Sequence, residues 1–350
     1  MKGAVVFGGY GTFGAHVCRE LARLGSIVTV AGRRLERAEA LARTLGAQHR
    51  AVAADVVDPA SCRAAVAGHA VAVHCAGPFS AFGHALLDAC LDAGCHYVDI
   101  ADDRAYAALV RGYGERFRAR RLAAVYGGSS LPGISGALAL LARGDEGEPA
   151  ERARVTLFIG NDNPKGEAAI RSAVAGLGRA IPAPQGALRG FGHGEVVALP
   201  EPFGRRRVYD FESPDYDLLP GLVDARAVWV KVGFESRLAT AAFAALARWG
   251  SGYGDATARV FAALGRLAIG GSSGGTVVSE LFFAGGRARR AALHAPRDGQ
   301  RMAALPAALA ARALEDGSAT ARGAFTAYEL LGAETLVARM VDADFALVRG

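Results

Sequence analysis

Several glycines near the start of the chain are placed so that its backbone can approach a phosphate group closely. The stretch Gly9-Tyr10-Gly11-Thr12-Phe13-Gly14 fits the pattern GxGxxG and stands between an apolar run and a helix-like run. A tight turn and a close approach to a pyrophosphate need residues without a Cβ, and the free N–H groups of a helix start attract an anion. We therefore predict that the following residues bind a dinucleotide: Gly8, Gly9, Gly11, Thr12, Phe13 and Gly14.

Two arginines, Arg33 and Arg34, follow the next apolar run, Ile27 to Ala31. An NAD site usually carries an acidic residue at this place to accept the ribose hydroxyls, whereas a guanidinium pairs with a 2′-phosphate. The sequence therefore favours NADP (NADPH) over NAD. The alternative is that these arginines are solvated and only begin the following helix.

Two further loops complete the predicted cofactor site. Asp55 and Val56 follow the third apolar run, where folds of this type contact the adenine, although Asp55 can also be an ordinary loop carboxylate. A Gly-Pro pair after the fourth run turns the chain away from the sheet and leaves room for a cofactor. We expect four residues there to lie beside the nicotinamide ribose: Cys75, Ala76, Gly77 and Pro78.

Hydride transfer is cofactor chemistry, so the protein must position the substrate and handle one proton. The carboxylates Asp99 and Asp102 follow the fifth apolar run and are our candidates for this proton, unless Asp102 or its neighbour Asp103 caps the next helix. Lys165, one of only three lysines, is a third candidate for contact with the substrate, within a polar loop that can also be a plain turn. Ser135 is either a ligand of the nicotinamide or substrate, or a helix cap. We predict no metal site.

Strands and helices in strict alternation must position these residues. The pattern predicts strands over Gly3 to Phe7, Ile27 to Ala31, Arg50 to Ala54, Ala70 to Cys75, His96 to Ile100 and Leu122 to Tyr126. It predicts helices over Thr12 to Leu24, Leu35 to Leu45, Pro59 to Val66, Phe82 to Ala93 and Asp103 to Arg118. Such alternation gives parallel strands with helical crossovers, which is a doubly wound α/β sheet that binds ligands at the carboxyl ends of its strands.

The middle of the chain has a different pattern, with longer strands. We predict strands over Ala153 to Gly160, Ala225 to Phe234, and an antiparallel pair, Gly275 to Ala284 and Ala288 to Ala295, with helices over Ala168 to Leu177 and Ser236 to Trp249. Arg205, Arg206 and Arg207 are interpreted as a solvated charge run or an anion patch. An α+β sheet of this kind commonly forms a substrate wall and a dimer interface, so we expect a homodimer that acts on a small-molecule substrate.

The stretches GGYGTFGAHV, VTVAGRR, CAGPFSAFGHALLDACLDAGCHYVDIADD and SSLPGIS resemble the saccharopine dehydrogenase-like NAD(P) oxidoreductases. The resemblance implies a Rossmann-type NADP-binding domain over residues 1–132 and an inserted α+β substrate and dimerisation domain over 133–300. It also implies that C-terminal helices, 301–350, pack back on the Rossmann domain.

The same resemblance implies an oxidoreductase that acts on a carbon–nitrogen bond next to a carboxylate. Related branches include enoyl reductases and proteins without an assigned activity. Our alternatives are therefore a trans-acting enoyl reductase and a non-catalytic NADP-binding redox sensor.

The composition indicates how many domains, which partners and which cellular compartment to expect. A chain of 350 residues suits two domains rather than one core. Its formal charge of +6 comes almost wholly from arginines without a basic tail, so we expect no nucleic-acid partner. Five cysteines, an odd number, favour a reducing compartment, and no apolar stretch reaches the roughly 18 residues of a membrane span. We therefore expect a cytoplasmic protein.

Overall fold

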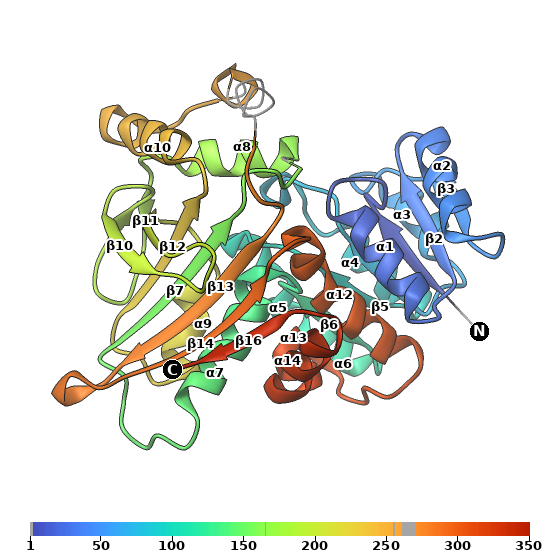
Figure 1. Ribbon diagram of the computed structural model, residues 1–350. Helices are drawn as coiled ribbons and strands as arrows, with labels where there is room; N and C mark the ends of the chain where they lie inside the picture. Colours follow the sequence, from blue (N-terminus) through green and yellow to red (C-terminus); the bar gives the residue numbers. More distant parts are fainter. Residues whose placement is uncertain (1–2, 165, 255, 261–269) are drawn as a thin grey trace. The chain divides into compact units, whose positions relative to one another are not determined.

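The computed structural model describes residues 3–164, 166–254, 256–260 and 270–350 (Figure 1). The chain forms two compact units, each built from two stretches of sequence. The first unit comprises Met1–Ser129 and Ala303–Gly332, and the second comprises Ser130–Met302 and Ala333–Gly350. The division falls within helix α12 (Gly299–Glu315), so the residues at the end of the chain are shared between the units.

The first unit is built on a sheet of seven parallel strands in the order β15-β6-β5-β4-β1-β2-β3. The strands are β1 (Ala4–Phe7), β2 (Val28–Gly32), β3 (Arg50–Ala53), β4 (Val71–His74), β5 (His96–Asp99), β6 (Ala123–Tyr126) and β15 (Gly323–Thr326). Strands β1, β2, β4 and β6 are buried along their whole length, which is why their sequences are apolar runs without alternation. The predicted doubly wound sheet is confirmed.

Helices follow the strands of this first sheet in turn. They are α1 (Gly14–Arg23), α2 (Leu35–Leu45), α3 (Pro59–Val66), α4 (Ala85–Ala93), α5 (Arg104–Gly112), α6 (Gly114–Ala119) and α13 (Ala327–Leu331), with a 3-10 turn, η1 (Phe79–Ala81), before α4. Sequence predicted one helix over Asp103 to Arg118, whereas the structure has two, α5 and α6, with Tyr113 between them.

The second unit contains a mixed sheet in the order β10-β11-β12-β7-β13-β14-β16. Its strands are β7 (Arg152–Ile159), β10 (Gly194–Ala198), β11 (Arg205–Asp210), β12 (Val228–Phe234), β13 (Gly275–Phe282), β14 (Ala288–Ala295) and β16 (Ala346–Arg349), and β8 (Ala180–Ile181) pairs separately with β9 (Leu188–Arg189). Strands β7 and β12 are parallel and the other pairs are antiparallel, which confirms the predicted α+β character.

Helices cover one face of this second sheet. The helical segments of the unit are η2 (Ser130–Ile134), α7 (Ser135–Arg143), α8 (Glu167–Gly176), α9 (Asp215–Leu222), α10 (Arg237–Trp249), η3 (Ala284–Gly286) and α14 (Ala333–Asp342). Helix α7 packs on β13 and β14, and α9 packs on β12. None of the described helices is long and apolar enough to cross a membrane.

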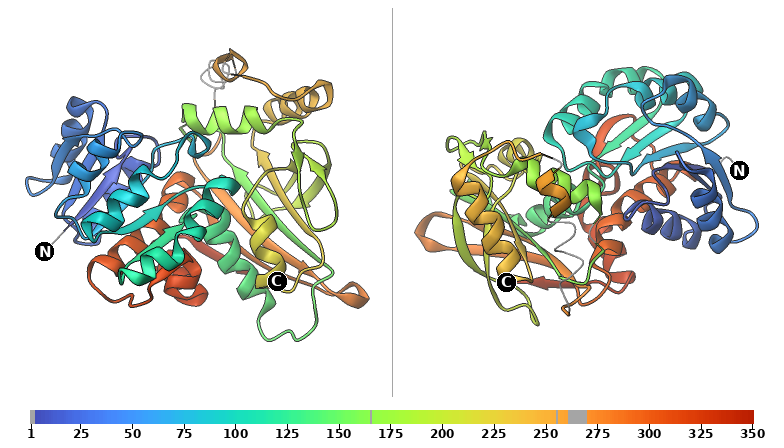
Figure 2. Two further views of the ribbon diagram at one scale, coloured as in Figure 1. Left: turned by 180° about the vertical axis from the view of Figure 1, so that it is seen from behind. Right: turned by 90° about the horizontal axis from the view of Figure 1, so that it is seen from above.

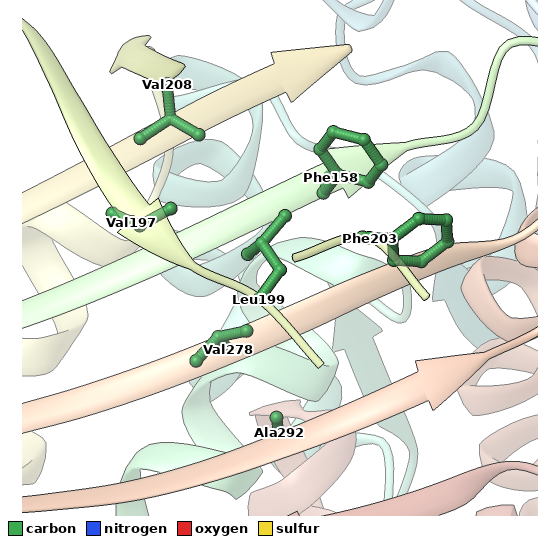
Figure 3. Packing of buried hydrophobic residues seen from close by; sticks show 7 residues of the cluster. All are labelled: Phe158, Val197, Leu199, Phe203, Val208, Val278 and Ala292. Atoms are coloured by element: carbon green, nitrogen blue, oxygen red, sulfur yellow. The ribbon is translucent and has the colours of Figure 1, made fainter. Parts of the chain in front are cut away.

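A loop covers part of the opposite face. Figure 3 shows side chains of the sheet meeting Leu199 and Phe203, which lie between β10 and β11. The ring centroids of Phe158 and Phe203 are 4.7 Å apart. The buried cluster consists of Phe158, Val197, Leu199, Phe203, Val208, Val278 and Ala292. The side chains after β10 therefore close this core in place of a helix.

The same face carries charged side chains that pair across strands. Lys231 is fully buried, and its Nζ lies 2.7 Å from Asp210 Oδ1 and 3.0 Å from His193 Nδ1. Arg154 donates to Glu195 at 2.7 Å and to Glu280 at 2.8 Å. Because a buried charge is costly unless it is paired, these ion pairs fix which strands can lie next to β7 and β12.

The structure adds to two sequence interpretations of this part of the chain. Arg205 and Arg207 are exposed, as expected of a solvated charge run, but the run forms the first half of strand β11, paired with β10, and the Cζ of Arg206 lies 5.7 Å from the ring centroid of Phe158. The segment 301–350 is not helical alone, because β15 pairs with β6 of the first sheet and β16 pairs with β14 of the second.

A buried carboxylate, Asp215, joins three elements of the second unit. It accepts hydrogen bonds from the hydroxyls of Ser135, at 2.7 Å, and of Ser213, at 2.5 Å, while Ser279 donates to the carbonyl oxygen of Ser135. Burial raises the pKa of Asp215 from 3.8 to about 6. The hydroxyl of Ser135, a candidate ligand group in the sequence, thus holds the start of α7 against α9.

The raised pKa of Asp215 predicts a pH-dependent stability. The folded state keeps a proton that the unfolded state has lost, so the stability contributed by this group is complete below about pH 4 and is lost as the pH rises through about 6. The difference corresponds to roughly 3 kcal/mol. We expect Asp215→Asn to gain stability relative to the wild type between pH 4.5 and pH 7.5, measured by thermal unfolding at both values.

The exposed Asp342→Asn on α14 is the matched control, for which we expect no such change between the two pH values. An equal difference between Asp215→Asn and wild type at both pH values would contradict the assignment.

Candidate functional site

The turn after β1 has a shape that only glycines permit. Gly8 has φ +70°, and a Cβ on it would lie 2.7 Å from the backbone nitrogen of Ala76. A Cβ on Gly14 would lie 2.2 Å from the carbonyl oxygen of Gly8. These two glycines therefore hold the backbone of the turn close to the start of α1 and to the loop after β4.

Gly11 differs from these two because it has free space beside it. A Cβ on Gly11 would meet only the carbonyl oxygen of Gly8, at 3.0 Å. Helix α1 begins nearby without a side-chain cap from Phe13 and without an acidic residue in its first turn. Its first N–H groups are thus not satisfied by a capping side chain, and a helix end of this kind attracts an anion. The arrangement fits the pyrophosphate of a dinucleotide.

The turn lies at the point where the strand order of the sheet reverses, which is where doubly wound sheets bind ligands. Strand β1 has β2 on one side and β4 on the other, so the chain leaves this point in opposite directions along the sheet. The backbone N–H of Cys75 donates to the carbonyl oxygen of Phe7 at 2.8 Å, which joins the carboxyl ends of β4 and β1. The loop containing Cys75, Ala76, Gly77 and Pro78 therefore starts beside the glycine turn.

Cys75 itself is suited to packing rather than to reaction as a thiolate. Burial raises the pKa of its thiol well above the usual range, with the charge of Asp99 adding to the effect. The thiol is therefore neutral at physiological pH. The contact of Cys75 and its neighbours with a nicotinamide ribose stays a prediction.

A tyrosine of the glycine turn organises the end of β2. A Cβ on Gly32 would lie 2.4 Å from Cε1 of Tyr10, so the phenol ring fills the space that a side chain at position 32 would need. The Tyr10 hydroxyl accepts a hydrogen bond from the backbone N–H of Arg34 at 3.0 Å. Arg33 and Arg34 are exposed, and neither pairs with a carboxylate among the described residues. Both guanidinium groups are thus available to an anion.

Asp55 and Val56 follow β3, but the carboxylate of Asp55 already has a local role. It accepts a hydrogen bond from the N–H of Val57 at 3.2 Å, while the N–H of Asp55 donates to the hydroxyl of Ser61. The side chain of Val56 is buried. The local hydrogen bonds account for the aspartate as a loop residue, and its contact with adenine stays a prediction.

Asp99 is a fixed carboxylate at the end of β5. Its Oδ1 accepts hydrogen bonds from the N–H groups of Ala101, at 2.9 Å, and Gly127, at 2.8 Å, so it joins the ends of β5 and β6. Burial raises the pKa of Asp99 to about 6.

The sequence left open whether Asp102 or Asp103 caps the helix that follows β5. The Asp103 side chain accepts a hydrogen bond from the N–H of Tyr106 at 2.8 Å and caps α5. Asp102 is exposed, yet enough protein surrounds it that desolvation raises the pKa of its carboxyl to about 6. Lys165, the third catalytic candidate, lies outside the described residues.

A buried histidine at the end of β4 was not among the predicted site residues. Nδ1 of His74 lies 3.2 Å from the hydroxyl of Tyr97 and 3.1 Å from that of Tyr106, and the two hydroxyls are 3.0 Å apart. Its Nε2 is buried and has no hydrogen-bond partner among the described residues. Burial lowers the pKa of His74 to about 3, so the imidazole is neutral. Since His74 and Asp99 are register partners on β4 and β5, they lie on the same face of the sheet.

The sheet brings most of the predicted site residues to one edge. The residues after β1, β2, β3, β4 and β5 all lie at the carboxyl ends of parallel neighbours. The sequence missed the roles of Tyr10 and Gly32, and it left open whether His74 is a site residue or a structural histidine. Tyr10 stands inside the GxGxxG pattern and Gly32 precedes the two arginines, so their positions were a usable signal, whereas the pairing of His74 with Tyr106 depends on the fold.

A family model describes the same part of the chain. Residues 4–127 match the model of the saccharopine dehydrogenase NADP binding domain. The matched residues make up most of the first unit. The resemblance inferred from the sequence is thus confirmed, and a nicotinamide dinucleotide is the cofactor class that the family supports.

A solved structure extends the likeness of fold to the whole chain. The apo, histidine-tagged saccharopine dehydrogenase (L-Glu forming) from Saccharomyces cerevisiae aligns over 100% of both chains with a TM-score of 0.66 and 13% identity. The 3-ketoacyl-(acyl-carrier-protein) reductase from Brucella melitensis, complexed with NADH, aligns over 36% of this chain and 73% of its own with a TM-score of 0.32 and 17% identity. A search of curated proteins gives no match.

The space beside Gly11 gives a test of the site. We expect Gly11→Val to weaken binding of both NADPH and NADH by roughly tenfold or more, because the added side chain fills the path of the pyrophosphate. The fold should survive, since only one atom is crowded. Titration of nucleotide fluorescence measures binding, and circular dichroism checks the fold.

Gly112→Val at the end of α5 is the control, because a Cβ there meets nothing within 4 Å. Wild-type nucleotide affinity in Gly11→Val would place the pyrophosphate elsewhere.

Proposed function

We propose that the chain is an NADP-dependent oxidoreductase of the saccharopine dehydrogenase-like type. The observation that carries the proposal is the pair of exposed guanidinium groups, Arg33 and Arg34, placed at the end of β2 beside a glycine turn. The family model over residues 4–127 supports the same cofactor.

The first unit would hold the cofactor through separate groups. The N–H groups at the start of α1, next to Gly11, would bind the pyrophosphate, and Arg33 and Arg34 would bind the 2′-phosphate through charge-assisted hydrogen bonds. No carboxylate fits at position 32 while Tyr10 lies there, so the repulsion that would exclude a 2′-phosphate is absent. The cofactor, when bound, supplies or accepts a hydride at C4 of its nicotinamide.

Asp102 is the better candidate for handling the proton. Asp99 already accepts two backbone hydrogen bonds and is fully buried, so moving a proton on it would disturb the joint between β5 and β6. Asp102 is exposed, and a pKa of about 6 lies near the working pH of a general acid or base. Asp102 would therefore exchange the proton with the substrate, and Asp99 would hold the strand ends.

The substrate we propose is small and carries a carbon–nitrogen bond next to a carboxylate, as in the resembled family. The second unit, with its mixed sheet, would bind it and would form the interface of a homodimer. The cytoplasmic location expected from the composition stays a prediction.

The two arginines give the sharpest test of cofactor preference. We expect Arg33→Ala/Arg34→Ala to weaken NADPH binding by roughly tenfold or more and NADH binding by less than about threefold, since only NADPH carries the 2′-phosphate. Arg37→Ala, an exposed arginine of α2, is the control and should leave both affinities unchanged. Equal losses for the two nucleotides would refute the pairing.

Turnover tests the proposed activity. We expect NADPH consumption when a 2-oxo acid and an amine are supplied together, and none with either alone. Asp102→Asn should lower kcat about a hundredfold or more without changing NADPH affinity. Asp103→Asn is the matched control, because asparagine also caps a helix.

The other outcomes separate the rival functions. Consumption with unsaturated acyl thioesters alone would identify an enoyl reductase. Tight NADPH binding without turnover on either class would favour the redox sensor, and wild-type kcat in Asp102→Asn would remove this residue from the proton transfer.

A further inference from the structure

The outer side of helix α10 presents an exposed apolar stripe. Leu238 is 85% exposed and Trp249 is 89% exposed, the highest values among the large apolar side chains that the structure describes. The residues between them on the same side are alanines, Ala241, Ala242 and Ala245, and all three are exposed. Spacings of three and four residues place the five on one side of the helix, over about 16 Å.

The inner side of α10 packs against other parts of the second unit. Phe243 and Ala247 pack in a buried cluster with Val174 of α8, with Leu177 directly after it and with Phe191. Figure 2 shows α8 and α10 next to each other at one end of the second sheet. The helix is thus fixed by its inner side, and folding does not require the outer stripe.

Positive charge surrounds this stripe. The stretches 170–190 and 236–254 contain five arginines and no Asp or Glu, in a chain whose formal charge is +6. Four of these arginines are exposed and have no carboxylate partner among the described residues: Arg179, Arg189, Arg237 and Arg248. Arg179 and Arg189 belong to this surface because Gly178, next to Arg179, lies against the backbone of Gly250 at the end of α10.

The carboxylate just before α10 does not neutralise these charges. Glu235 accepts hydrogen bonds from the backbone N–H groups of Asn161, at 2.8 Å, and Ser272, at 2.7 Å. These bonds and the nearby charge of Arg206 lower its pKa. It serves the loops after β7 and before β13 rather than the arginines of α10.

We propose that the outer side of α10 and the arginines around it bind the surface of an anionic lipid bilayer. A helix with an apolar side and flanking cations lies in the plane of such an interface, with its apolar side chains at the boundary between headgroups and acyl chains. Trp249 suits this depth because its ring is apolar and its N–H is polar. The arginines attract the anionic headgroups.

Two other occupants fit the surface less well. A second copy of the chain would bring two basic faces together, and like charges across an interface disfavour association. A nucleic acid would leave Leu238 and the three alanines in water. The proposal concerns a helix lying on a membrane and is independent of the nucleotide site.

Vesicle flotation without nucleotide tests the proposal. We expect the wild type to float with vesicles of equal parts phosphatidylcholine and phosphatidylglycerol, to bind pure phosphatidylcholine at least tenfold less, and to dissociate in about 0.5 M salt. Leu238→Ser/Trp249→Ser and, separately, Arg237→Gln/Arg248→Gln should each reduce the bound fraction at least tenfold.

Matched variants of the first unit serve as controls. Leu35→Ser/Val57→Ser removes exposed apolar side chains and Arg19→Gln/Arg63→Gln removes exposed charges, and both should float as the wild type does. Failure of the wild type to bind the anionic vesicles would overturn the proposal, as would binding that persists in both α10 variants. Light scattering that shows self-association of the wild type, lost in Leu238→Ser/Trp249→Ser without any vesicle binding, would assign the stripe to a second copy instead.

Discussion

The close approach of the β1 turn to the β4 loop is the constraint on which the proposed nucleotide site depends. The hydrogen bond from Cys75 to Phe7 and the position of Gly8 against Ala76 bring two backbones together without a side chain between them. Any Cβ at position 8 would push the two backbones apart. These two main-chain contacts therefore hold the turn before α1 next to the residues after β4.

Tyr10 packs closely on Gly32, and this second close contact bears on the proposed preference for NADP over NAD. The ring occupies the space in which an acidic side chain would otherwise stand, and its hydroxyl holds the N–H of Arg34. Tyr10 therefore both fills the space beside position 32 and holds the backbone of Arg34. In the sequence, Tyr10 is only a variable position of the GxGxxG pattern. In the structure, it contacts Gly32 of β2.

The first unit could be predicted from the sequence because its strands are short, buried runs that alternate with helices. The second unit was harder to predict because its strands depend on distant partners. Arg205 and Arg207 are exposed, as the sequence suggested, but nothing local indicates that their run is a strand, since the strand is defined by pairing with β10 and by Arg206 lying over Phe158. Likewise, a buried Lys231 is understandable only once Asp210 and His193 lie next to it.

The acidic residues after β5 show why the chemical role of a residue was harder to predict than its place in the sheet. The sequence placed Asp99, Asp102 and Asp103 at the correct edge of the sheet, but a carboxylate can bind backbone, cap a helix or move a proton, and the choice depends on which N–H groups point toward it. Gly127 and Ala101 point toward Asp99, and Tyr106 points toward Asp103. Hydrogen bonds from main-chain N–H groups thus give Asp99 and Asp103 structural roles. Asp102 is exposed and has a raised pKa. Its protonation can therefore change without altering a strand end or a helix start.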